Sequence, residues 1–181
     1  MAPDTGRSAP SPGPERLLGV YLNDHRAGSA AGVALLRRMV RAHRGTPAAA
    51  RLVALLRDVE EDQDSLMEVM EAFDVPVGHV KSLLMRLAEK AGRAKPNGRL
   101  VARSPLSDVL ELEAMLLGVQ GKLALWRSLG NVARTDSRVD RAAMHRLAAR
   151  AERQIALLEG LRLAAVDRAF TPGGRAVPAA V

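Results

Sequence analysis

Apolar residues recur at helical spacing along most of the chain, and this pattern predicts four long helices. The first covers about residues 15–43 and stops at Gly45. The second begins at Thr46, which suits an N-cap, and has Pro47 in its first turn. The inner positions of this second helix keep a seven-residue repeat, which is typical of a helix packed on a neighbour along its whole length. These positions are Leu52, Leu56, Val59, Gln63, Leu66, Met70 and Phe73.

The second half of the chain repeats this arrangement. The third helix begins after Ser104 and runs to about residue 130, and the fourth covers about 139–168, with Asp136 or Ser137 at its start. Only a few residues link the first helix to the second and the third to the fourth, so each pair is expected to form an antiparallel hairpin. Two hairpins of similar length predict an all-α four-helix bundle.

The connection between the two hairpins is much longer than the other links. It runs from about residue 74 to 104, whereas links in helical bundles usually have roughly 2–8 residues. An amphipathic pattern over about 76–92 predicts an extra helix within this crossover. Residues 1–14 and 169–181 are rich in proline, glycine and small residues, and they predict a disordered arm and tail around one domain at 15–168.

Composition narrows the class of protein further. Hydrophobic residues make up 48% of the chain but aromatic residues only 2%, which favours helices over strands. The absence of cysteine excludes disulfides, thiol catalysis, Cys-ligated zinc and iron–sulfur clusters. The N-terminal residues lack the apolar stretch of a signal peptide, and no apolar run is long enough to span a bilayer. We therefore expect a soluble, cytoplasmic protein.

Polar and small residues interrupt the apolar face of the first helix. Asn23, Asp24 and His25 are followed by a run of glycine, alanine and serine at 27–32. Because each glycine in a helix costs about 0.5–1 kcal/mol relative to alanine, the run predicts the close approach of another helix.

Counting residues from the two turns places polar side chains of all four helices near the middle of the bundle. They are Asp24, His25, Glu60, Gln63, Glu113 and Glu152. Buried groups of this kind must be paired, hydrogen-bonded or bound to a metal. Two interpretations follow: a site for a metal ion or small ligand, or a hydrogen-bond network that fixes how the helices pack.

The two hairpins, the long crossover and the mid-bundle acids resemble the ferritin-like superfamily over residues 15–168. Its di-iron members use one Glu from each of two helices and a Glu-x-x-His motif from each of the other two. The resemblance implies that Glu113 is the lone Glu of the third helix. It also implies that Glu60 and Gln63 form the paired motif of the second, with Gln in place of His.

In the same resemblance, Asp24 or His25 stands in for the lone carboxylate of the first helix. Glu152 takes the place of the Glu of the fourth helix, where Ile155 replaces the paired His. The resemblance thus implies a degenerate site for iron or another divalent metal. The two missing histidines argue against a di-iron redox enzyme, and because no recognised catalytic motif is present, we expect no enzymatic activity.

The formal net charge of +7 is concentrated in the crossover. Between residues 81 and 103 there is one acid, Glu89, against seven basic residues: Lys81, Arg86, Lys90, Arg93, Lys95, Arg99 and Arg103. This segment predicts contact with an acidic partner or with the phosphates of nucleic acid or lipid, or else a solvated face that pairs with the acids at 60–64. No nucleic-acid-binding motif accompanies it, and it has no aromatic residues on which bases could stack. The competing function is therefore a non-enzymatic interaction module, in one version a homodimer.

Overall fold

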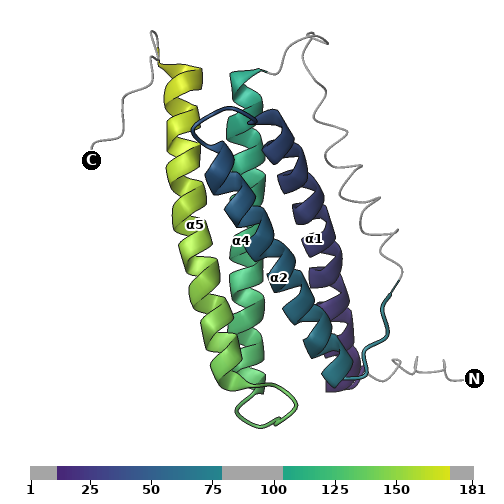
Figure 1. Cartoon of the computed structure of the whole chain (residues 1–181). Coiled ribbons are helices and arrows are strands. Elements are labelled where there is room, and N and C mark those ends of the chain that lie inside the picture. Colours follow the sequence, from purple (N-terminus) through teal and green to yellow (C-terminus); the bar gives the residue numbers. More distant parts are fainter. Residues whose placement is uncertain (1–11, 79–103, 172–181) are drawn as a thin grey trace, which may run out of the picture.

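The computed structural model describes residues 12–78 and 104–171, and all regular structure within these two ranges is helical (Figure 1). The four helices are α1 (Pro14–Ala42), α2 (Ala49–Ala72), α4 (Pro105–Val132) and α5 (Arg141–Phe170). At about 1.5 Å per residue they are about 36–45 Å long. Because the described ranges contain no strand, the all-α prediction is confirmed. None of these helices is long and apolar enough to cross a membrane.

Side chains that cap the helix N-termini explain where α4 and α5 begin. The Ser104 hydroxyl accepts a hydrogen bond from the Leu106 backbone N–H (3.3 Å), and Asp140 accepts one from the Ala142 N–H (2.8 Å). Each bond satisfies a backbone donor that has no partner inside its helix. The predicted start of the third helix is therefore confirmed.

Two other predicted helix starts were wrong. The Thr46 hydroxyl donates a hydrogen bond to the carbonyl of His43 (2.8 Å) within the turn, and α2 begins only at Ala49 without a side-chain cap. Asp136 instead accepts hydrogen bonds from Nε and Nη2 of the Arg138 side chain and from the Arg138 backbone N–H, so it orders the turn before α5. In both turns, a local hydrogen bond competes successfully with capping of the helix that follows.

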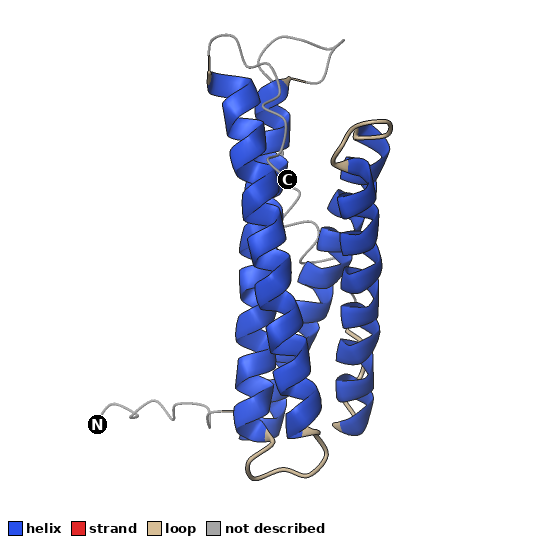
Figure 2. Ribbon diagram, turned by 60° about the vertical axis from the view of Figure 1, so that its left-hand side comes forward, coloured by secondary structure: helices blue, strands red, loops and turns tan. Residues whose placement is uncertain are grey.

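The helices form two antiparallel hairpins, α1–α2 and α4–α5 (Figure 1). Figure 2 shows α4 and α5 close together along their length, with the other hairpin beside them. The α4–α5 pair packs most closely, and α1 packs against both α2 and α4. This arrangement agrees with the predicted four-helix bundle.

The interior is built mainly from leucine, valine and methionine around a single tryptophan, Trp126, whose side chain is 1% exposed. In α2 the buried face differs from the predicted one. It consists of Leu52, Leu55, Val59, Asp62, Leu66, Val69 and Met70. The predicted positions Leu56, Gln63 and Phe73 are only partly buried. Since consecutive residues are about 100° apart around a helix, a shift of one residue places Asp62 in the interior in place of Gln63.

The start of the crossover lies along α1. Asn23 Nδ2 donates to the carbonyl of Pro76 (3.2 Å), Gly78 N–H donates to Asn23 Oδ1 (2.7 Å), and Arg26 Nη1 donates to the carbonyl of Gly78 (3.2 Å). Residues 76–78 are not helical, so the extra helix does not begin at Pro76. The rest of that predicted helix, with the basic residues from Lys81 to Arg103, lies outside the described residues.

Candidate functional site

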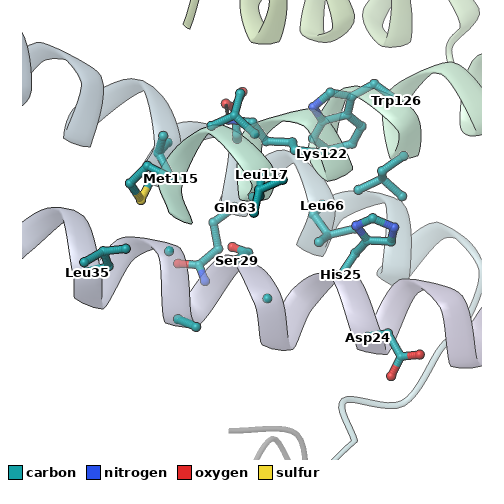
Figure 3. A pocket seen from close by; sticks show the side chains of 18 of the residues that line it. Asp24, His25, Ser29, Leu35, Gln63, Leu66, Met115, Leu117, Lys122 and Trp126 are labelled. Atoms are coloured by element: carbon teal, nitrogen blue, oxygen red, sulfur yellow. Dashed lines mark hydrogen bonds and ion pairs between the residues drawn. The ribbon is translucent and has the colours of Figure 1, made fainter. Parts of the chain in front are cut away.

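Three of the six polar residues expected at mid-bundle line one cavity between α1, α2 and α4. They are Asp24, His25 and Gln63. Figure 3 shows the side chains of His25 and Gln63 directed into this cavity and that of Asp24 directed away from it. The His25 ring packs edge-on against Tyr21, with 4.5 Å between the ring centroids. Residues of the first two helices at this level therefore border the same cavity.

The other three predicted residues, Glu60, Glu113 and Glu152, do not reach the cavity. Each is partly exposed or exposed and forms an ion pair with an arginine instead. The pairs are Arg37–Glu60 (2.6 Å), Arg162–Glu113 (3.9 Å) and Arg127–Glu152 (2.7 Å). Within 12–78 and 104–171, no group of three or more His, Asp and Glu side chains could hold a metal ion. The described residues thus do not assemble the six-residue metal site.

A different set of polar residues is buried between the helices. Asp62 of α2 has a side chain only 1% exposed, and its carboxylate forms an ion pair with the ammonium of Lys122 of α4. Gln154 of α5 joins both, because its Nε2 donates to Asp62 Oδ2 (3.1 Å) and its Oε1 accepts from Lys122 Nζ (2.6 Å). Three helices from both hairpins therefore meet at one carboxylate.

Arg150 of α5 completes this network on its outer side. Its Nη2 lies 2.5 Å from Asp62 Oδ1, and its Nη1 donates to Glu61 Oε2 (2.7 Å). We call Asp62, Lys122, Arg150 and Gln154 the Asp62 network. A buried carboxylate is stable only with partners of this kind, so the network accounts for an acid in the middle of an apolar seam.

Burial also shifts the ionisation of two groups beside the cavity. Desolvation lowers the pKa of the Lys122 ammonium below its ordinary value, and the nearby Asp62 carboxylate offsets part of this effect. Burial likewise lowers the pKa of His25, with a smaller opposing effect from Asp24. His25 is therefore neutral near pH 7, when one ring nitrogen donates and the other accepts hydrogen bonds.

The cavity has a volume of about 700 Å³ and mostly apolar walls. From α1 it is lined by Tyr21, Asp24, His25, Gly28, Ser29, Ala31, Gly32 and Leu35, and from α2 by Val59, Asp62, Gln63 and Leu66. The wall from α4 consists of Ala114, Met115, Leu117, Gly118, Val119, Lys122, Leu125 and Trp126. Two members of the Asp62 network, Asp62 and Lys122, thus reach its surface.

Small residues on two helices keep this space open. A Cβ atom added to Gly28, Gly32 or Gly118 would meet no other described residue within 4 Å. The predicted close approach of another helix is therefore not found at Gly28 or Gly32 among the described residues, whereas Ala27 of the same run is buried. These glycines border a cavity, and the helical pattern alone does not distinguish a void from a tight contact.

Three residues of the cavity wall have a buried polar atom without a hydrogen-bond partner among the described residues. The atoms are Trp126 Nε1, Ser29 Oγ and Asp62 Oδ1, and the last of these forms an ion pair with Arg150. In the view of Figure 3, the indole nitrogen lies on the edge of the Trp126 ring turned toward Lys122. Buried polar groups in proteins are nearly always hydrogen-bonded. Trp126 Nε1 and Ser29 Oγ are fully covered by neighbouring atoms, so they lie behind the cavity surface and a molecule in the cavity does not reach them.

Sequence reasoning missed Lys122, Trp126, Asp62 and Gln154 as candidate site residues, although their spacing carries a signal. Lys122 lies three residues after the buried Val119 and four before Trp126, so it falls on an apolar face. Gln154 lies three residues after Ala151 and four before Leu158, both fully buried. A charged or amide residue that is flanked in this way on both sides is a strong indication of a buried polar contact.

The comparisons with known proteins give no further guidance. The chain matches no protein-family model, no curated protein and no solved structure. The geometry of the cavity and its polar groups is therefore the basis of the functional proposal.

Proposed function

We propose that the protein binds a small, mainly apolar molecule in the cavity between α1, α2 and α4. The observation that carries this proposal is a cavity of about 700 Å³ with mostly apolar walls, beside which Gly28, Gly32 and Gly118 leave open space. Sites for small molecules typically have volumes of about 300–1,000 Å³, apolar walls and a few well-placed polar groups. The cavity has all three properties.

The glycines on its walls support the same proposal. Gly28, Gly32 and Gly118 each lower helix stability relative to alanine, and no described neighbour requires the missing side chain. A bound molecule that occupies the space beside them provides a reason for their presence. It would also recover the dispersion contacts that an unfilled cavity lacks.

The groups at the cavity favour an organic ligand over a metal ion. Lys122 carries a positive charge there. Divalent metal sites in proteins are built mainly from several carboxylate, imidazole, thiolate or carbonyl groups that converge on one point. His25 is the one imidazole in the wall, and the carboxylate of Asp62 is already bound to Lys122 and Arg150.

A ferritin-like fold remains part of the proposal. The two antiparallel hairpins and the long connection between them support it. Gln63 and Ile155, at the positions where the family has its paired histidines, argue against the di-iron chemistry of that family. The proposed function is therefore ligand binding within such a scaffold, without a redox reaction.

A fluorescence titration tests the proposal directly, because Trp126 is the only tryptophan in the chain. The probe is the uncharged dye propionyl-dimethylamino-naphthalene (Prodan), which accepts excitation energy from tryptophan and fluoresces more strongly in apolar surroundings. We expect saturable binding of one dye per chain, with quenching of Trp126 emission and a matching rise in dye emission.

Leucine substitutions provide the matched control. Gly32→Leu and Gly118→Leu place bulk into the cavity and are expected to weaken dye binding about tenfold or more, which corresponds to about 1.4 kcal/mol. Gly160→Leu makes the same change at an exposed position of α5 with open space around it, and it is expected to leave binding unchanged. Absence of saturable binding, or equal binding by all three variants, would refute the proposal.

A further inference from the structure

Two contacts fix how α1 and α4 lie against each other on either side of the cavity. The Tyr21 hydroxyl donates to Ser128 Oγ (3.4 Å), and Arg38 Nη2 lies 2.9 Å from Glu111 Oε1. Arg38 comes seventeen positions after Tyr21 on α1, and Glu111 comes seventeen positions before Ser128 on α4. The two helices therefore run antiparallel and side by side between these two levels, with no change of register.

The cavity is long in the direction of these helices. Its lining residues on α1 fall between positions 21 and 35, and those on α4 between 114 and 126. At about 1.5 Å per residue, the two stretches are about 21 and 18 Å long. Figure 3 shows His25 and Leu35 toward opposite ends of the cavity, and the two glycines between them, Gly28 and Gly32, have open space beside them. The lining residues thus enclose one elongated space.

The cavity is also narrow. A volume of about 700 Å³ over a length of about 20 Å corresponds to a mean cross-section of about 35 Å². The space is therefore about three times as long as it is wide. A compact ring system of the same volume would leave both ends empty. An extended hydrocarbon chain follows this shape and contacts the walls along its whole length, which recovers the most dispersion energy.

The polar side chains that point into the cavity suit an uncharged group. Figure 3 shows His25 and Gln63 directed into it. His25 is neutral near pH 7 because burial lowers its pKa, and a neutral imidazole and an amide both donate and accept hydrogen bonds. A carboxylate, in contrast, would compete with Asp62 for Lys122, which is the only lysine or arginine in the described wall. A hydroxyl finds partners here without carrying a charge into apolar surroundings.

We infer that the ligand is a single extended aliphatic chain that lies between α1 and α4, parallel to both, and carries at most a small uncharged group such as a hydroxyl. This inference rests on the proposed function, because it names the class of molecule that the same cavity takes. An extended chain advances about 1.25 Å per carbon, given C–C bonds of about 1.52 Å and bond angles near 111°. About 14–17 carbons therefore match the length of the cavity.

A series of alcohols tests the shape by displacement of Prodan, followed through the dye's own emission. The compounds are the even-numbered straight-chain alcohols from n-octanol to n-octadecanol, supplied from cyclodextrin, with affinities corrected for binding to the cyclodextrin. We expect the affinity to rise about fourfold for each added methylene group, which is the effect of burying one such group. The rise is expected to stop at a limiting chain length of about 14–17 carbons, because further carbons stay in water. A flat series, or one that still rises at n-octadecanol, overturns the inference.

Two matched substitutions on α1 show whether the limiting chain length is set by this cavity. Leu35→Trp places bulk at one end of it, and it is expected to shorten the limiting chain length by about two to four carbons while n-octanol binds as before. Leu17→Trp makes the same change at a residue that is 55% exposed and does not line the cavity, and it is expected to keep the wild-type limit. An unchanged limit in folded Leu35→Trp, or an equal shift in both variants, overturns the inference. If Leu35→Trp does not fold, the wild-type series decides alone.

The outcomes separate this inference from the proposed function. Dodecanoate has the same number of carbons as n-dodecanol and is expected to bind more weakly, because it carries a charge into the cavity. Dye binding without a dependence on chain length, or with tighter binding of dodecanoate than of n-dodecanol, overturns the inference but leaves a ligand-binding cavity. Failure of wild type to bind the dye and every alcohol refutes the proposed function itself.

Discussion

The Asp62 network makes a strong prediction about stability. Asp62→Asn keeps the size of the side chain and its ability to hydrogen-bond with Gln154 but removes the charge that Lys122 and Arg150 share. Removal of one partner from a buried ion pair costs about 3–5 kcal/mol, because the remaining charge is left unpaired. The side chains of Lys122 and Arg150 are 15% and 21% exposed, so water compensates in part. We therefore expect a loss of about 3 kcal/mol.

Urea unfolding followed by far-ultraviolet circular dichroism measures this loss. For a chain of this length, about 3 kcal/mol corresponds to a melting temperature lower by about 6–12 °C. The dependence of the unfolding free energy on urea concentration is expected to stay the same, since the substitution exposes no new surface. Asp64→Asn is the matched control: Asp64 is exposed on the same helix, and its loss is expected to change stability by less than about 0.5 kcal/mol.

A double variant tests the physical cause. Lys122→Met removes the charge that Asp62→Asn leaves unpaired, so the double variant is expected to be more stable than Asp62→Asn alone by about 1 kcal/mol or more. Arg150 retains Glu61 as a partner in both variants. If Asp62→Asn costs less than about 1 kcal/mol, or if Lys122→Met adds to the loss, unpaired buried charge is not what the network prevents.

Three further predictions concern single positions. Gly32→Ala is expected to stabilise the protein by about 0.5–1 kcal/mol, because the added Cβ atom meets open space. Gly160→Ala is the control, with an equal expected gain in stability. A loss of stability in Gly32→Ala alone would contradict the described cavity. The lowered pKa of His25 means that the unfolded chain binds more protons between that pKa and the ordinary value of 6.5. Stability should therefore fall as pH decreases from about 6.5 through this window, and a slope that persists unchanged in His25→Leu would exclude His25 as its source. Asp140→Ala is expected to lower the stability of the protein by about 1 kcal/mol, because it removes the side chain that caps α5. Ser137→Ala is expected to leave stability unchanged. Equal effects of the two substitutions in thermal unfolding would contradict the observed helix start.

The helices were predictable because their ends carry local signals. Ser104 before Pro105 marks the start of α4, and Gly45 marks the turn after α1, where its φ of 77° suits glycine. The helix starts predicted at Thr46 and Asp136 were wrong for a local reason as well. Both side chains bond within their own turns, and the sequence does not reveal which of two nearby backbone partners a short polar side chain selects.

The candidate site was less predictable because the phase of α2 is ambiguous. Leu55 and Leu56 are both apolar, so the helix pattern fits almost equally well with either residue facing inward. A neutral amide costs less to bury than a carboxylate, which favours Gln63 over Asp62 when the helix is considered alone. The correct phase depends on Lys122, which is sixty positions away in the chain. Only the packing of separate helices brings these charges together.

The position of the Asp62 network also affects how many ways the two hairpins can fit together. Along α2 the buried Leu52, Val59 and Leu66 follow one another at intervals of seven residues, so a slip of α2 by about 10.5 Å would replace one aliphatic side chain with another of similar shape. Leucine contacts alone would distinguish poorly between the two alignments. In the slipped alignment, however, the carboxylate of Asp62 would lose Lys122 and Gln154 together and face hydrocarbon. Asp62 therefore disfavours the displaced packing, so that the two hairpins pack in one alignment along the bundle axis.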